Sequence, residues 1–113
     1  MELQDAVKSL AALAQGTRLE VFRALVKSGE EGIAAGALAE ELAIPANTLS
    51  FHLKELANAG LVRPRREGRS IFYHLEIGSV RELLGFLMED CCQGNPELCL
   101  PFTTAACGEK AGC

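Results

Sequence analysis

Two short helical patterns, separated by a break and followed by a change of period, constrain the fold of this chain most strongly. The segment "GALAEELAIPANTLSFHLKELANAG" places leucines at helical spacing on both sides of Pro45 and Asn47. Proline interrupts a helix because it lacks a backbone donor and restricts the residue before it. Two short helices joined by about four residues form a helix-turn-helix. We therefore expect a second helix over residues 47–59, ended by Gly60.

The period changes directly after this pair of helices. The segment "LVRPRREGRSIFYHL", residues 61–75, carries β-branched and aromatic residues on both sides of Glu67 and Gly68. This pattern predicts a β-hairpin. Pro64 is compatible with it because a two-stranded hairpin has only edge strands. The fold class that follows is mainly α with a β-hairpin wing, a winged helix-turn-helix.

Three further helices are expected around this unit. An apolar stripe over residues 3–14 predicts the first of them. The second begins at Thr17, which can form a capping box with Glu20, and ends at Gly29. Its expected buried face consists of Leu19, Phe22, Leu25 and Val26. Another capping box, Ser79 with Glu82, marks the last helix. The apolar positions of that helix are Ile77, Val80, Leu84, Leu87 and Cys91.

The size of the chain suits one folded domain. Of its 113 residues 49% are apolar, which is too many for a chain that is disordered throughout. We expect this domain to cover residues 1–92, followed by a cysteine-containing tail over residues 93–113 that is rich in glycine, proline and threonine. The start, "MELQDAVKSLAALA", has no basic segment and no apolar run that could span a membrane. These features predict a cytoplasmic protein without a membrane partner.

Basic residues are concentrated in one stretch of an acidic chain. Between residues 48 and 75 five basic residues face two acidic ones, a local charge of +3, which leaves −7 for the rest of a chain of net charge −4. The basic residues are Lys54, Arg63, Arg65, Arg66 and Arg69. Such segregation is typical of a DNA-binding patch. A solvated surface strip would give the same charge pattern.

The helix expected over residues 47–59 has a second face. With Leu49, Leu53 and Leu56 toward the core, Phe51 falls nearly opposite. In a major groove Phe51 could contact thymine methyl groups, and neighbouring hydroxyl groups could bind base edges or phosphates. The alternatives are that Phe51 packs beneath the hairpin and that His52 is a half-buried histidine. The candidate DNA-binding residues on this helix are Asn47, Thr48, Ser50, Phe51, His52 and Lys54.

Three arginines at the hairpin tip, Arg65, Arg66 and Arg69, suit contacts to phosphates or to the minor groove. The alternative for them is a solvated turn.

Three segments together resemble the ArsR/SmtB family of winged-helix repressors, over about residues 6–92. They are "LAQGTRLEVFRAL", "LAEELAIPANTLSFHLKELANAGLV" and "RREGRSIFYHL". The resemblance implies a homodimer through the first and last helices, with a recognition helix at 47–59 and a wing at 61–75. It also implies a regulator, not an enzyme, which releases double-stranded operator DNA when a metal ion or metalloid binds.

All five cysteines lie after residue 90, and their odd number in a reducing compartment argues against a disulfide framework. Many family members bind metal through a Cys-x-Cys pair, but the matching segment here reads "AAGAL", with Ala34 and Gly36 in place of the thiols. The last helix also has no histidine for a zinc site. The cluster of Cys91, Cys92 and Cys99 resembles instead the relocated trivalent-arsenic site of a subgroup of arsenite repressors. Cys107 and Cys113 are secondary candidates.

The chemistry of the thiols agrees with this interpretation. Thiolates select soft ions, and the spacing fits no four-ligand zinc template, whereas trivalent arsenic and antimony bind three sulfurs in a pyramid. We expect arsenite as the inducer and antimonite as a second one. The alternatives are a cadmium or lead sensor, a redox switch through a disulfide between Cys92 and Cys99, and a tail of unligated thiols. A thiol enzyme is a further alternative, but no base or phosphate-binding loop stands near Cys91.

Overall fold

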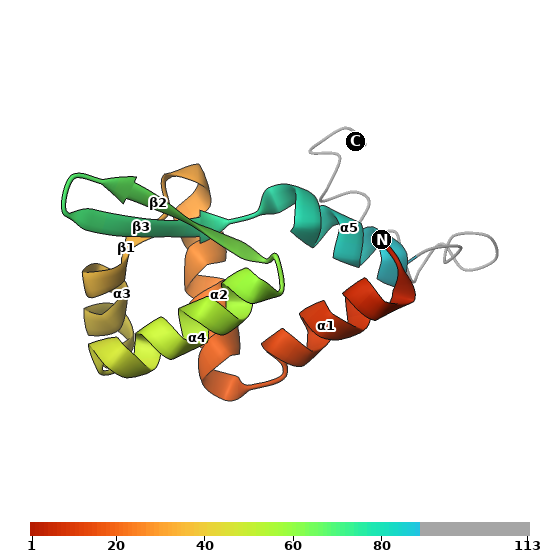
Figure 1. Ribbon diagram of the computed structural model, residues 1–113, viewed down its shortest axis with the longest axis horizontal. Helices are drawn as coiled ribbons and strands as arrows, with labels where there is room; N and C mark the ends of the chain where they lie inside the picture. The colour runs from red at the N-terminus through yellow and green to blue at the C-terminus, as the bar shows by residue number, and fades with distance from the viewer. Residues whose placement is uncertain (89–113) are drawn as a thin grey trace. The chain divides into compact units, whose positions relative to one another are not determined.

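The computed structural model describes residues 1–88, which form helices and a small antiparallel sheet (Figure 1). The helices are α1 (Leu3–Leu13), α2 (Gly16–Ser28), α3 (Ala35–Leu42), α4 (Ala46–Asn58) and α5 (Ile77–Leu87), with a 3-10 turn, η1 (Gly29–Glu31), after α2. The strands are β1 (Ile33–Ala34), β2 (Val62–Glu67) and β3 (Ser70–Leu75). Within residues 1–88, no helix is long and apolar enough to cross a membrane. The chain divides into two units, Met1–Leu83 and Leu84–Cys113, and the packing described below is that of the first.

The predicted helix-turn-helix is confirmed, and it consists of α3 and α4. The connection is short because Ala43 adopts the left-handed conformation, with φ of 56°. Its backbone N–H donates to the carbonyl oxygens of Ala39 and Glu40, so the last turn of α3 is closed before the chain reverses. Pro45 then stands immediately before α4, where its missing donor is not needed.

The predicted wing is present, but its sheet has three strands instead of two. The strand order is β1-β3-β2, and β2 pairs with β3 from Val62 opposite Leu75 to Glu67 opposite Ser70. Gly68, with φ of +63°, starts the two-residue turn between them. The third strand, β1, has only two residues, too few to give a periodic signal in the sequence. Pro64 lies in β2, which is an edge strand of this sheet.

A leucine-rich core joins the helix-turn-helix to the wing. Its largest fully buried side chains are Val21, Leu25, Leu38, Leu49, Leu53, Leu56, Leu61 and Val62. These residues come from α2, α3, α4, the residue before β2 and the start of β2, so burial fixes α4 against the other elements. Each buried leucine or valine contributes about 1.5–3 kcal/mol relative to an exposed one. The buried face predicted for the helix over residues 47–59 is confirmed.

The predicted face of α2 was wrong in part. Leu19 is 44% exposed and Val26 is 51% exposed, whereas Val21, Ala24 and Leu25 are buried. Apolar residues stand on more than one side of this helix, so the spacing in sequence did not determine which side meets the core. The side that packs is the one turned toward α4 and β3, which is a property of the tertiary structure.

Two predicted helix starts were also wrong. The N-cap of α2 is Gln15, whose Oε1 accepts a hydrogen bond from the backbone N–H of Arg18 at 2.8 Å. Thr17 therefore lies inside the helix. The last helix begins at Ile77, so Ser79 lies in its first turn and is not its cap. In both cases the helix starts earlier than the Ser/Thr signal. The amide side chain of Gln15 caps α2, and the first backbone hydrogen bond of α5 runs from the N–H of Val80 to the carbonyl oxygen of Glu76.

Candidate nucleic-acid interface

The outer face of α4 is polar because its inner face is held in the core. Leu49 and Leu53 are 1% exposed and Leu56 is fully buried, which fixes the rotation of the helix about its axis. The predicted DNA-binding residues that are exposed on it are Asn47, Thr48, Ser50, Phe51 and Lys54. The structure therefore brings five of the six predicted residues of this helix to one open side.

The burial of Phe51 and His52 decides between the alternatives that the sequence left open for them. Phe51 is 56% exposed, so it points away from the core and is not packed beneath the wing. His52 is only 9% exposed, and its ring meets the ring of Phe51 edge-on, with centroids 5.5 Å apart. Its Nδ1 has no hydrogen-bond partner among residues 1–88. The structure thus separates His52 from the open residues of α4 and places it in the layer that supports Phe51.

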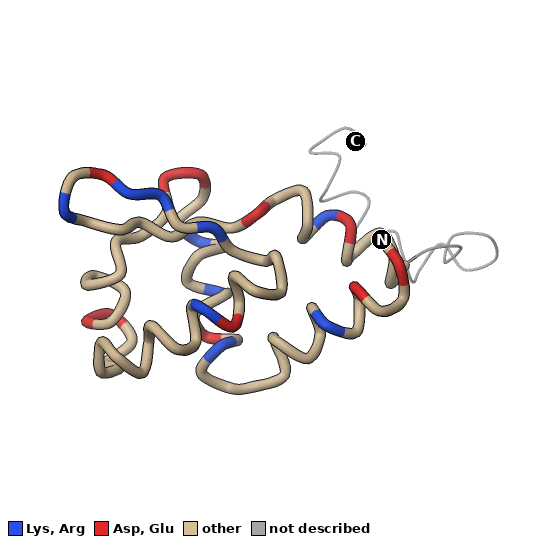
Figure 2. Tube along the Cα trace, in the orientation of Figure 1, with Lys and Arg blue, Asp and Glu red and all other residues tan. Residues whose placement is uncertain are grey.

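The wing carries the basic residues beyond α4. Figure 2 shows them along β2 and at the turn that joins β2 to β3, with an acidic position between them. Arg66 and Arg69 are exposed, and neither forms an ion pair within the described part of the chain. Arg65 is engaged instead with Glu67, through a 2.7 Å contact from its Nε to Oε2. Sequence reasoning treated these three arginines alike, and the structure does not.

Arg63 is a basic residue of β2 that the predicted site did not include. Its Nη1 lies 3.1 Å from Oε2 of Glu76, the residue that precedes α5. The Glu76 backbone N–H also donates to the carbonyl oxygen of Leu61 at 2.9 Å. The base of the wing and the start of α5 are therefore connected twice. Only the charge of Arg63 was visible in the sequence, since its partner lies 13 residues further along the chain.

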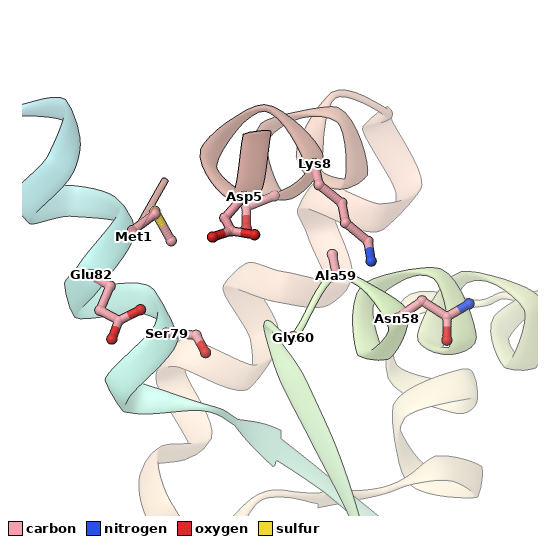
Figure 3. A pocket seen from close by; sticks show the side chains of 9 residues that line it. Met1, Asp5, Lys8, Asn58, Ala59, Gly60, Ser79 and Glu82 are labelled. Atoms are coloured by element: carbon pink, nitrogen blue, oxygen red, sulfur yellow. The ribbon is translucent and has the colours of Figure 1, made fainter. Parts of the chain in front are cut away.

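A hollow of about 220 Å³ lies on another side of the Met1–Leu83 unit, between α1, the end of α4 and the first turns of α5 (Figure 3). Its lining includes the carboxylates of Asp5 and Glu82, the ammonium group of Lys8 and the hydroxyl group of Ser79. It is open to solvent and mixed in charge. The hollow has none of the basic character of the α4 and wing surface, and none of the predicted site residues line it.

The predicted sensor residues Cys91, Cys92 and Cys99 lie outside the described residues, as do Cys107 and Cys113. The positions of the family's Cys-x-Cys pair can be located: Ala34 ends β1 and Gly36 lies in the first turn of α3. Among residues 1–88, no three His, Cys, Asp or Glu side chains come together as they would around a metal ion. The cysteine site stays a prediction.

Comparison with known proteins agrees with this geometry. Residues 13–65 match a family model described as a helix-turn-helix domain. The chain is 40% identical over 78 residues to the HTH-type transcriptional regulator KmtR of Mycobacterium tuberculosis, covering 69% of this chain and 58% of KmtR. It is 32% identical over 90 residues to the transcriptional activator HlyU of Vibrio cholerae, covering 80% of this chain and 81% of HlyU. The chain thus spans less than two thirds of KmtR.

A solved structure is similar over most of the chain. It is the homodimeric winged helix-turn-helix DNA-binding domain of Mb0332 from Mycobacterium bovis, described as a possible ArsR-family transcriptional regulator. The TM-score is 0.64 at 27% sequence identity, with 80% of this chain and 82% of that chain covered.

Proposed function

Because the chain belongs to the ArsR/SmtB family of winged helix-turn-helix transcriptional regulators, we propose that it is an arsenite-responsive repressor. It binds operator DNA as a homodimer and leaves the DNA when trivalent arsenic binds its cysteines. One observation carries the DNA-binding half of this proposal. The face of α4 opposite the buried leucines is exposed and polar, and the exposed Arg66 and Arg69 extend the basic surface onto the wing.

The side chains on this surface suit the major groove. An α-helix fits that groove, where the exposed ring of Phe51 meets thymine methyl groups and the hydroxyl groups of Thr48 and Ser50 bond to base edges or phosphates. Arg66 and Arg69 bind the phosphate backbone beside it. Two such helices in a dimer read half-sites about 34 Å apart, one turn of the duplex.

Exposed apolar residues on two helices support the dimer. On α1, Leu3, Val7 and Leu10 are 62%, 52% and 41% exposed and recur at helical spacing. On α5, Ile77, Leu84 and Leu87 are exposed in the same way. Large apolar side chains aligned along a helix and left in water mark an interaction surface. We assign both stripes to the homodimer interface, as the resemblance to the family implies.

The position of the thiols supports the sensor half. The five cysteines all follow α5 in the sequence, and the first of them, Cys91, comes four residues after Leu87, the last residue of that helix. Because α5 carries an interface stripe, an ion bound just beyond it acts on the helix that sets the spacing of the two α4 helices. Three sulfurs, from Cys91, Cys92 and Cys99, complete the coordination of trivalent arsenic or antimony. Coupling of this kind is reciprocal, so DNA weakens arsenic binding by the same factor by which arsenic weakens DNA binding. The coupling free energy is typically about 1–3 kcal/mol.

The test is the binding of the protein to its own promoter DNA, measured by gel shift with and without arsenite, antimonite, cadmium and peroxide. Arsenite and antimonite are expected to release the DNA from the wild type. Serine at Cys91, Cys92 or Cys99 is expected to abolish release and to leave DNA binding intact. Cys107→Ser is the matched control and keeps the response. X-ray absorption of the arsenic-bound protein is expected to show three sulfur ligands.

The other outcomes distinguish the alternatives. Release by cadmium alone, or by lead alone when lead is added to the same assay, identifies a different soft-metal sensor on the same scaffold. Release by peroxide alone identifies a redox switch, for which Cys92 and Cys99 are the candidate pair because adjacent cysteines form strained disulfides. If none of these reagents changes DNA binding, the thiols are not the sensor. Retained release in Cys92→Ser shows that a different set of three cysteines binds the ion.

A further inference from the structure

Arg65 differs from the other arginines at the tip of the wing because groups from three segments hold its guanidinium. Its Nε donates to Oε2 of Glu67 at 2.7 Å, and its Nη2 donates to the backbone carbonyl oxygen of Glu31 at 3.0 Å. Its Cζ lies 5.3 Å from the ring centroid of Phe72, which stands opposite Arg65 in the β2–β3 register. That distance is within the range of a cation–π interaction. Two donors and one face of the guanidinium plane are therefore occupied.

These partners lie across the width of the sheet. Glu67 ends the edge strand β2, Phe72 lies on the central strand β3, and Glu31 closes η1 shortly before β1. The side chain of Arg65 thus reaches from one edge of the sheet, over the central strand, to the turn that leads into the other edge strand. Because α3 starts directly after β1, this contact connects the wing to the segment that enters the helix-turn-helix.

Arg66 and Arg69 have no such partners. Both are exposed, and within residues 1–88 neither forms an ion pair or a side-chain hydrogen bond. Arg66 lies near the end of β2 and Arg69 is the second residue of the Gly68 turn, in the part of the wing furthest from the core contacts of Val62 and Leu75. β1 pairs with the middle of β3, at Tyr73 and Phe72, but β2 is an edge strand that pairs with β3 alone. The direction in which these two arginines point therefore depends on what holds the middle of β2.

We propose that Arg65 is a positioning residue: it holds the wing at the angle at which Arg66 and Arg69 meet the DNA backbone, and it does not itself bind a phosphate. This inference rests on the proposed binding of DNA. The role requires arginine, because a planar guanidinium donates in two directions while its face covers a ring, whereas a lysine ammonium group is a point charge without that geometry.

Arg65→Lys separates this role from a phosphate contact. A lysine keeps the positive charge, so a residue that merely neutralises a phosphate would tolerate the change. A positioning residue would not, and promoter affinity is expected to fall by about threefold to tenfold, the scale of a lost or weakened charge-assisted hydrogen bond. Fluorescence anisotropy at fixed salt measures the affinity, and circular dichroism at the same temperature establishes that the variant is folded.

Glu67→Ala tests the same role through the direction in which DNA affinity changes, and this test does not require the Arg65→Lys variant to fold. Removal of a carboxylate beside DNA ordinarily strengthens binding, and Glu55→Ala on α4 is the matched control in which that gain is expected. If Glu67 anchors the positioning arginine, its removal weakens binding instead. Stronger binding by Glu67→Ala, or unchanged binding by a folded Arg65→Lys, overturns the proposal.

A double substitution completes the test. When Arg66 and Arg69 are both replaced by alanine, the wing has no phosphate contacts left to position. Arg65→Lys is then expected to have no further effect on affinity. A loss by the same factor in both backgrounds would mean that Arg65 makes its own guanidinium-dependent contact to DNA, and would overturn the proposal. Failure of the wild type to bind its promoter DNA at all would instead refute the proposed function. The two failures are therefore distinguishable.

Discussion

Gly32→Ala is expected to destabilise the protein strongly, through the junction between η1 and β1. Gly32 has φ of +76° and ψ of −173°, a region that essentially only glycine enters and that costs an alanine about 1–3 kcal/mol. A Cβ at this position would lie 2.5 Å from the carbonyl oxygen of Tyr73 and 3.1 Å from its carbonyl carbon, closer than van der Waals contact allows. Both atoms belong to the backbone of β3, so the clash is relieved only by separating β1 from β3. Loss of one or two of their backbone hydrogen bonds adds about 1–2 kcal/mol.

The expected loss in the free energy of unfolding is therefore about 2–5 kcal/mol, a large part of the 5–15 kcal/mol typical of a domain. Urea denaturation followed by circular dichroism, at one protein concentration, measures it. Gly36→Ala is the matched control, because a Cβ there meets nothing within 4 Å and the residue lies in α3. The control is expected to be neutral or to gain up to about 1 kcal/mol. A Gly32→Ala protein within about 0.5 kcal/mol of the wild type would refute the reasoning.

Three further substitutions address the turn, the open face and the interface. Ala43→Gly is expected to stabilise the protein by about 0.5–1 kcal/mol in the same denaturation assay, because glycine adopts the left-handed conformation without a steric penalty. Phe51→Ala is expected to weaken promoter binding in anisotropy measurements while the free energy of unfolding changes little. Leu53→Ala in the core is the comparison and is expected to cost about 2–5 kcal/mol of stability. Equal losses of stability in the two variants would contradict the outward placement of Phe51. Val7→Glu is expected to convert the dimer to a monomer in analytical ultracentrifugation, and a dimer of unchanged affinity would exclude the stripe on α1 from the interface.

The elements that could be predicted from the sequence are those with a strong local signal. Leu49, Leu53 and Leu56 recur at one helical spacing on an otherwise polar segment, so both the helix and its buried face followed from the pattern. The hairpin was equally clear because a glycine turn separates two β-rich stretches. The outward position of Phe51 was one of two alternatives, and the choice required the rest of the fold.

Two of the misses share a physical cause, and the third is local. The faces of α2 differ little in hydrophobicity, so which one is buried depends on contacts with α4 and β3 that are distant in sequence. The strand β1 is too short for a periodic signal and exists because it pairs with β3. The cap at Gln15 uses an amide side chain in place of the expected hydroxyl group. The face of α2 and the strand β1 are thus decided by partners distant in sequence, whereas the cap is local and differs from the prediction in the position and type of its side chain.

The basic residues show the same limit, and they yield a prediction for the salt dependence of DNA binding. Of the five in the basic stretch, Arg63 is paired with Glu76 and Arg65 with Glu67, which leaves Lys54, Arg66 and Arg69 without an ion pair among the described residues. Exposed pairs of this kind contribute only about 0–1 kcal/mol to stability, but they decide which cations are available to phosphates. Each phosphate neutralised contributes about −0.9 to the slope of log affinity against log salt concentration, so three residues in each protomer predict a slope of about −5 for the dimer. A slope near −9 in anisotropy titrations between about 50 and 200 mM salt would mean that all five cations bind phosphates. The ion pairs of Arg63 and Arg65 would then have to open on binding.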